Sequence, residues 1–278
     1  MEIPVGQNMF TQPENNGWVR TLARFGFAAK GLVYVLIGAL SLQAAFSGGG
    51  RTAGGHEAVG VLGEQPFGQA LLIVVGIGLL GYALWREVLA LKDPGHVGHD
   101  AKGKAERVGW AASGAISAGL AITAFQLALG RGGGGGDGSR TWVGKVMEQP
   151  FGGVLVGLAG LVVIAVAVQQ LRKAMKSRFA RDLSTQDMSP PERTWVFRMA
   201  RVGLVSRGVV FGIIGAALIK AAITHDPGQS KGVGEALSTV AASPFGPMLL
   251  VLVAAGLCAY GVYMFFCTKY SKLAHPAA

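Results

Sequence analysis

The chain alternates long apolar stretches with shorter polar ones. Six windows of about 20 or more residues carry almost no charge, and a helix of that length crosses the hydrocarbon core of a bilayer. Lipid offers the backbone no hydrogen-bond partner, and the windows lack the alternation of barrel strands, so each is predicted to be a transmembrane helix. The predicted spans are residues 27–46, 67–91, 108–129, 151–171, 202–223 and 245–267.

The composition agrees with a helical bundle in lipid. Hydrophobic residues make up 51% of the chain, charged residues only 14%, and there are 44 glycines. A soluble domain normally carries about a quarter charged residues. The segment before the first span contains no apolar core followed by a cleavage site, so we expect the first helix to be retained as an anchor.

Charge is distributed unevenly between the two sides of this predicted bundle. The net charge is +10, and most basic residues precede the first span, follow the last, or fall in the second and fourth connections. The positive-inside rule then places both termini in the cytoplasm of a multi-pass protein of the cytoplasmic (inner) membrane. The expected partners are the bilayer, including its anionic lipids, and a membrane protein complex. Nucleic acid is not expected, since no binding motif accompanies the charge.

An internal repeat of two helices is the most informative feature of the sequence. The first helix of each copy opens with Arg-x-Gly-x(4)-Gly, and the second opens with Pro-Phe-Gly. Proline suits the first turn of a helix, where its missing N–H costs nothing. The residues that define the repeat are Gly31, Gly114, Gly208, Pro66, Pro150 and Pro244.

The repeat predicts the organisation of the whole chain. We expect a cytoplasmic tail at 1–17, repeat one at 18–93, repeat two at 94–176, a cytoplasmic linker at 177–194, repeat three at 195–270 and a tail at 271–278. Each copy is a hairpin, so successive copies keep the same orientation. The predicted fold is an all-α integral membrane protein with six transmembrane helices, arranged as three parallel two-helix repeats with pseudo-threefold symmetry along the membrane normal.

These motifs resemble a bacterial membrane family known only as domain of unknown function 1206. The resemblance extends from about Trp18 to Tyr270 and includes the aromatic ending of the second helix in repeat one, at Tyr82 and Trp85. It implies three concatenated two-helix units and a membrane location, and it implies no activity. Repeat two departs from the pattern at that ending, where it carries Val166, Gln169 and Gln170.

One polar residue recurs at matching depth in the first helix of each repeat. Gln43, Gln126 and Lys220 each lie twelve residues beyond the shared glycine. If they face a common axis, they form a polar ring that would coordinate a solute or an anion. If they face neighbouring helices or headgroups, they are ordinary interfacial groups, and Lys220 would then extend from its helix end toward water. The second interpretation is favoured.

Two further sets of charged residues have a simpler interpretation than a binding site. Arg24, Arg107 and Arg201 form a candidate basic ring at the cytoplasmic ends, where positive-inside anchoring explains them without a gate or an anion site. Glu64 and Glu148 precede the prolines and are expected to interact with a helix N-terminus.

The sequence contains no set of residues suited to catalysis or cofactor binding. No Ser/His/Asp or Cys/His set occurs, and no carboxylate pair lies deep in a span, so we do not expect an enzyme. His96 and His99 lie in a connection that would not fix metal geometry. The glycine run at 132–136 precedes no nucleotide-binding helix, so neither a metal nor a cofactor is predicted.

Two classes of function follow from this pattern. The favoured hypothesis is a non-catalytic accessory or scaffold subunit of the cytoplasmic membrane, which predicts a closed apolar bundle centre. The alternative is a passive channel or small-solute transporter with a path near the pseudo-threefold axis, which predicts polar residues converging on that path. The absence of a carboxylate near mid-membrane argues against coupled transport.

Overall fold

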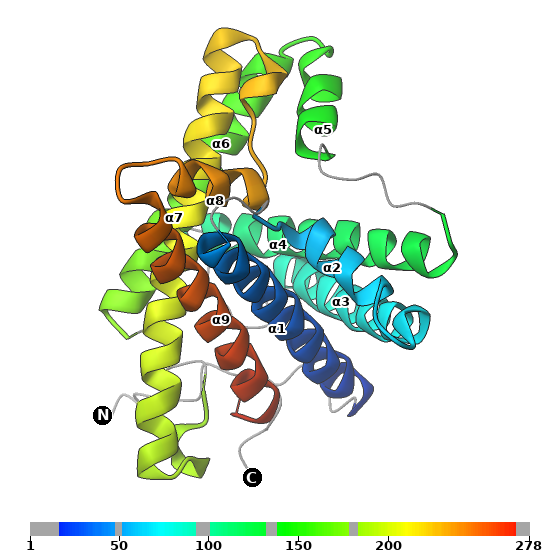
Figure 1. Cartoon of the computed structure of the whole chain (residues 1–278), viewed down its shortest axis with the longest axis vertical. Helices are drawn as coiled ribbons and strands as arrows, with labels where there is room; N and C mark the ends of the chain where they lie inside the picture. Colours follow the sequence, from blue (N-terminus) through cyan, green and yellow to red (C-terminus); the bar gives the residue numbers. More distant parts are fainter. Residues whose placement is uncertain (1–16, 48–51, 93–100, 132–137, 178–182, 271–278) are drawn as a thin grey trace, which may run out of the picture.

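The protein is a bundle of long helices joined by short ones (Figure 1). The structure, a computed structural model, describes residues 17–47, 52–92, 101–131, 138–177 and 183–270. The long helices are α1 (Gly17–Phe46), α3 (Gly68–Lys92), α4 (Ala101–Ala128), α6 (Gly152–Met175), α7 (Pro190–Thr224) and α9 (Gly246–Tyr270).

All six predicted spans are confirmed as helices that are long and apolar enough to cross a membrane. Their boundaries differ most for α7, which begins at Pro190 rather than at residue 202. The backbone N–H of Ser189 donates to the Glu192 carboxylate at 3.0 Å, which makes a capping box, and Pro190 follows in the first turn. The last part of the predicted linker is therefore helical.

A short helix precedes the second long helix in every repeat, and the sequence analysis did not predict it. These helices are α2 (Gly55–Gly63), α5 (Gly138–Met147) and α8 (Val233–Ala241). The short turns η2 (Thr185–Asp187) and η3 (Pro227–Gln229) flank α7. The repeat unit is therefore long helix, short helix, long helix.

The Pro-Phe-Gly motif forms the turn between the short and the long helix. Pro66 was expected inside the first turn of the long helix, and that expectation is wrong by two residues, because α3 begins at Gly68. Gly68 N–H donates to the Gln65 carbonyl at 2.8 Å, and Phe67 takes a positive φ of 62°. The same turn recurs around Pro150 and Pro244.

The glycine of this turn is needed because the short helix ends directly against it. A β-carbon on Gly68, Gly152 or Gly246 would overlap a carbonyl oxygen from the last turn of the preceding short helix. The exposed phenylalanine, by contrast, occupies a backbone region that L-residues with bulky side chains rarely adopt.

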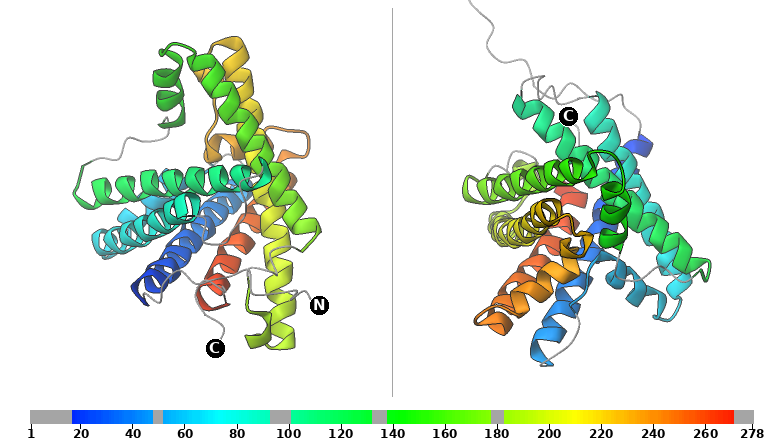
Figure 2. Two further views of the ribbon diagram at one scale, coloured as in Figure 1. Left: turned by 180° about the vertical axis from the view of Figure 1, so that it is seen from behind. Right: turned by 90° about the horizontal axis from the view of Figure 1, so that it is seen from above.

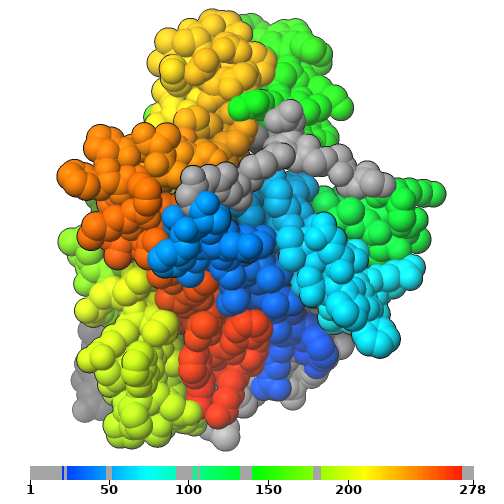
Figure 3. All heavy atoms as spheres, viewed as in Figure 1, coloured from blue at the N-terminus to red at the C-terminus, as the bar shows by residue number. Residues whose placement is uncertain are grey.

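The tightest packing joins helices of different repeats. The second long helix of each repeat packs against the first helix of the next, which pairs α3 with α4 and α6 with α7, and the pairing of α9 with α1 completes the cycle. Figure 3 shows α9 and α1 side by side on one face of the molecule. This cyclic order is the threefold relation that the repeat predicts.

The repeat glycines make these three contacts possible. Gly31 lies against Gly261, Gly114 against Ala83, and Gly208 against Ala167. A β-carbon on these glycines would lie 2.9, 3.2 and 3.3 Å, respectively, from the backbone oxygen of the facing residue. The three facing residues occupy the same register position in the three repeats. The glycines therefore act in close helix packing, as small residues commonly do in membranes.

The two long helices of a repeat pack on each other in repeats one and three but hardly at all in repeat two. Helix α1 packs on α3, and α7 packs on α9, whereas α4 and α6 barely touch among the described residues. Figures 1 and 2 show the α3–α4 pair diverging from the α6–α7 pair. Repeat two is therefore open where the other two repeats are closed.

Two apolar clusters fill the bundle. One includes the short helices α2 and α8 together with Val33, Leu79 and Leu257. The other is rich in aromatic residues and lies toward the chain termini, where it includes Tyr82, Trp85 and Tyr260 together with Leu183 and Met188 of the connection before α7. Polar side chains of α1 and α7 lie among the aromatic residues at this second cluster.

Candidate functional site

The residue immediately before the shared glycine is Lys30 in repeat one, Ser113 in repeat two and Arg207 in repeat three. Lys30 donates a hydrogen bond to the Ser113 hydroxyl at 3.1 Å. Lys30 and Arg207 are each only 8% exposed, although both lie inside helices that span the membrane. These three equivalent residues, which we call the triad, form the candidate site.

Tyrosines from the second long helices surround the two cations. The Lys30 ammonium lies 4.0 Å from the centre of the Tyr82 ring, and the Arg207 guanidinium lies 4.3 Å from the centre of the Tyr260 ring. Tyr82 and Tyr260 occupy the same register position in repeats one and three. Each contact of this kind contributes about 0.5–2 kcal/mol.

The tyrosine hydroxyls accept hydrogen bonds from basic side chains. Arg86 Nε donates to the Tyr82 hydroxyl at 2.8 Å, and an Arg207 N–H donates to the Tyr260 hydroxyl. Arg207 also lies over the rings of Tyr34 and Phe211. The site therefore holds three cations, Lys30, Arg86 and Arg207, among aromatic rings.

The positive charge of the triad lacks a carboxylate partner. In the part of the chain that the structure describes, neither Lys30 nor Arg207 forms an ion pair with an aspartate or glutamate. The Glu87 carboxylate packs instead against Gly114, next to Ser113 in sequence. Arg207 Nε is buried and has no hydrogen-bond partner.

Uncompensated charge in a membrane interior is costly, and such residues usually mark a binding site or a path. Aromatic rings and phenol hydroxyls reduce this cost but do not neutralise two cations. An anion bound beside the triad would supply both the missing charge and an acceptor for Arg207 Nε. The arrangement is thus suited to binding an anion.

The predicted polar ring lies outside this site. The side chains of Gln43, Gln126 and Lys220 are all exposed, and none belongs to the buried core. The Lys220 carbonyl accepts a hydrogen bond from Thr224 near the end of α7. The polar residues that the structure brings together are instead those of the triad.

The arginines of the predicted basic ring brace the ends of neighbouring helices. Arg107 donates to the Ala90 and Leu91 carbonyls at the end of α3, and Arg201 donates to Ser177 just beyond α6. Cations are favourable near the last carbonyls of a helix. Arg24, the third member, is exposed on α1.

Several other candidate residues lie away from the triad or outside the described residues. Glu64 and Glu148 are exposed in the turns that follow α2 and α5. His96, His99 and the glycine run at 132–136 lie outside the described residues. No group of three or more potential metal ligands occurs among the described residues.

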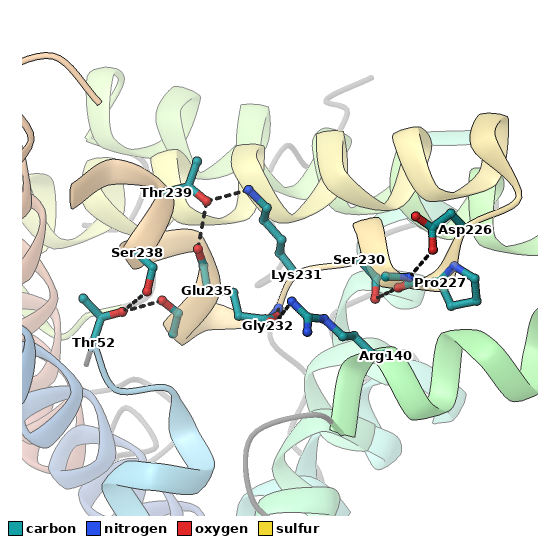
Figure 4. A network of polar contacts seen from close by, with 12 residues as sticks. Thr52, Arg140, Asp226, Pro227, Ser230, Lys231, Gly232, Glu235, Ser238 and Thr239 are labelled. Atoms are coloured by element: carbon teal, nitrogen blue, oxygen red, sulfur yellow. Dashed lines mark hydrogen bonds and ion pairs between the residues drawn. The ribbon is translucent and has the colours of Figure 1, made fainter. Parts of the chain in front are cut away.

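A second polar network joins the three repeats at the opposite end of the bundle (Figure 4). Thr52 of repeat one contacts the Gly234 carbonyl and the Ser238 hydroxyl of α8, each at 2.6 Å. Arg140 of α5 forms an ion pair with Glu235 at 2.7 Å. Helix α8 is therefore the element to which the other two repeats attach.

The turn that leads into α8 is fixed by Asp226. Its carboxylate accepts hydrogen bonds from the Gln229 side-chain amide at 3.0 Å and from the Gly228 N–H at 2.8 Å. These donors hold the pKa of the Asp226 carboxyl below its usual range. The polar groups of this network named above bond to other groups of the chain. The network therefore holds the helices together and is not a candidate binding site.

The sequence analysis missed the triad because it considered basic residues only by the connection they lie in or near, and Lys30 and Arg207 then count with the basic residues that flank the spans. A signal was present, since both residues lie six positions inside the arginine that opens the helix, at the same register position. That depth is more than one helical turn, about 9 Å, beyond the flank. The register identifies the position, and the structure shows that the side chains are buried.

The fold and the site define a polytopic helical membrane protein built from three repeats, with a cationic cluster enclosed among its helices. The family model described as Domain of Unknown Function (DUF1206) matches the chain three times, at residues 25–93, 108–177 and 202–270. The chain therefore belongs to this family, in agreement with the resemblance in its motifs.

A curated relative matches most of this chain. It is a Bacillus subtilis (strain 168) protein named "Uncharacterized protein YxxB", which is 34% identical over 250 residues. The match covers 90% of this chain and 90% of the relative. This relative agrees with a bacterial family. No solved structure matches the chain.

Proposed function

We propose that this membrane protein binds a small anion at the triad, so that its role is solute handling, the alternative that the sequence left open. The observation that carries the proposal is the convergence of Lys30, Ser113 and Arg207 from equivalent positions, without a carboxylate partner. The recognised chemistry is that of a phosphate or carboxylate group, which accepts several N–H and O–H hydrogen bonds at once.

The same chemistry is offered by a free anion and by the headgroup of an anionic lipid.

The experiment that tests the proposal uses purified protein in nanodiscs of neutral phospholipid and follows its thermal unfolding. Inorganic phosphate is compared with sodium chloride at equal ionic strength, since chloride has neither a phosphate nor a carboxylate group. A ligand that binds only the folded state at 100 times its Kd adds about 2.7 kcal/mol, which raises the unfolding midpoint by several degrees.

A second set of nanodiscs contains phosphatidylglycerol and no phosphate. If a free anion is the ligand, phosphate raises the midpoint in neutral discs and the anionic lipid does not. If a lipid headgroup is the ligand, the anionic discs already show the higher midpoint. Unchanged midpoints in both sets would overturn the proposal.

Variants on α7 separate the site from general charge effects. Arg207→Gln should abolish the stabilisation by either anion, because it removes the guanidinium whose Nε has no partner. Arg198→Gln is the matched control, since Arg198 is exposed on the same helix and lies beside Trp195. Retention of the full effect in Arg207→Gln would also contradict the proposal.

The accessory or scaffold role is the second candidate, and the open repeat two favours it. Helices α4 and α6 expose large apolar side chains, including Ile116 and Leu161, and barely contact each other. A photocrosslinker at position 116 should then capture a stoichiometric membrane protein in native membranes. The same group at exposed Leu252 of α9 should not. Both roles are consistent with a non-catalytic protein of the cytoplasmic membrane.

A further inference from the structure

Repeats one and three are each closed by a glycine that lies on a tyrosine. A β-carbon on Gly26 would lie 2.9 Å from the Tyr82 backbone, and one on Gly203 would lie 2.6 Å from the Tyr260 α-carbon. The equivalent Gly109 of repeat two has Val166 Cγ2 as its nearest neighbour, at 3.9 Å. The crossing of the two long helices is therefore loose in repeat two alone.

Two register positions explain why α4 and α6 stand apart. Gly78 of α3 and Gly256 of α9 let the helices approach closely, since a β-carbon at Gly78 would meet Ala29 at 2.7 Å. Repeat two has Val162 at this position, and a valine side chain does not fit the close approach that the glycines allow. Repeat two also has Val166 and Gln169 where repeat one has Tyr82 and Trp85 and repeat three has Tyr260 and Tyr263.

The short helix of repeat two is displaced for a related reason. Ala58 of α2 and Ala236 of α8 are 0% exposed, whereas the equivalent residue of α5 is Trp142, which is 69% exposed. The indole is too large for the space that an alanine fills. Helix α5 packs on α6 and η3 rather than in the angle between α4 and α6.

This opening adjoins the triad. Lys30 and Tyr34 come from α1, Tyr82 from α3, Ser113 from α4, Arg207 from α7 and Tyr260 from α9. Helix α6 contributes none of these hydrogen-bond and cation–π contacts. Val166 of α6 stands where the other repeats have a tyrosine. Ser113, the member of the triad on α4, is half-buried, in contrast to Lys30 and Arg207.

We propose that an anion reaches the triad laterally, through the seam between α4 and α6, with Val166 at its entrance and the amides of Gln169 and Gln170 on the side of the chain termini. The seam is the access route because tyrosines cover the triad in the other two repeats. The inference rests on the proposed anion binding and adds a route and its gating residue to it.

The test measures access to position 113 directly, without relying on anion binding. Ser113→Cys is introduced in a chain whose native Cys258 and Cys267 are replaced by serine, and it is labelled with an anionic methanethiosulfonate in nanodiscs. We expect reaction in the otherwise unchanged chain. Adding Val166→Tyr supplies the missing third tyrosine and should slow labelling by about tenfold, because thiol reactivity depends on access.

Val168→Tyr is the matched control, since Val168 lies on the same helix and is exposed. It should leave the labelling rate unchanged, and the unfolding midpoints of both variants show whether they fold. An unreactive thiol at position 113, or equal rates with and without Val166→Tyr, would overturn the proposed route.

A reversible cross-link keeps the route testable if Val166→Tyr fails to fold. Gly109→Cys and Val166→Cys place two thiols across the seam, where a β-carbon on Gly109 would lie 3.9 Å from Val166 Cγ2. The oxidised form should lose the phosphate-dependent rise in midpoint and regain it on reduction. Labelling at position 113 with no phosphate effect would overturn the binding function alone, and a phosphate effect that survives the cross-link would overturn the route alone.

Discussion

Lys30 donates a hydrogen bond to Ser113 at 3.1 Å, and the two residues occupy the same position in consecutive repeats. The partner is a neutral hydroxyl, so the bond orients the ammonium without neutralising it. In the absence of an anion the lysine is therefore a source of instability.

Lys30→Met should make the anion-free protein more stable. Methionine has a similar length and removes a buried charge, and such replacements commonly gain about 1 kcal/mol or more, equivalent to about 2–4 °C for a chain of this size. Thermal unfolding in neutral nanodiscs measures the change. Exposed Lys104→Met is the control. A lower midpoint for Lys30→Met would identify Lys30 as a structural residue instead.

Alanine at the three equivalent glycines should have opposite effects on stability. Gly26→Ala and Gly203→Ala force a β-carbon into the backbone of a facing tyrosine and should cost about 1–3 kcal/mol. Gly109→Ala meets nothing closer than 3.9 Å and should gain up to about 1 kcal/mol from its higher helix propensity. Unfolding midpoints in one detergent compare the three. Equal losses at all three positions would contradict an open repeat two.

The fold could be predicted from the sequence because two simple patterns, long apolar windows and an internal repeat, extend over most of the chain. Apolar windows define the spans, and the recurrence of Gly31, Gly114 and Gly208 defines the order of packing. The short helices were missed because nine or ten residues are too few to show a clear apolar period. Their formation depends on the angle between the long helices that they fill.

The candidate site was harder to predict because charge counted by loop ignores which face of a helix a residue occupies. Lys30 and Arg24 look equivalent in such a count, yet one is buried and the other exposed. The sequence also differs at the two positions that open repeat two, Trp142 and Val162. These differences could be interpreted only with the structure, which shows that the equivalent residues of repeat one, Ala58 and Gly78, lie in helix contacts.

The turn before each long second helix should tolerate asparagine better than valine. Phe67, Phe151 and Phe245 have φ values of 62°, 63° and 58° and are exposed. Asparagine adopts this region readily, whereas a β-branched residue does so at a cost of about 1–2 kcal/mol. Phe67→Asn should match or exceed the parent midpoint, and Phe67→Val should fall below it.

The same pair of substitutions at Phe151 and Phe245 provides an internal replicate, because the three turns share one geometry. Midpoints in detergent are the appropriate readout, since they exclude effects of lost lipid contact at these exposed side chains. Valine variants as stable as asparagine variants in all three repeats would show that backbone conformation does not limit stability here.

The orientation predicted from the basic residues is tested by cysteine labelling in intact cells. Gly134→Cys and Gln186→Cys are introduced, one at a time, in a chain that lacks Cys258 and Cys267. Position 134, which lies outside the described residues, is predicted to face the exterior, and exposed Gln186, in the connection before α7, is predicted to face the cytoplasm. A membrane-impermeant maleimide should label the Gly134→Cys variant in intact cells and the Gln186→Cys variant only after lysis.

Lysed cells are the control for this labelling: both variants should react there, which shows that each introduced thiol is reactive. The reverse pattern in intact cells would contradict cytoplasmic termini, and it would also place the termini-side end of the α4–α6 seam on the outer face.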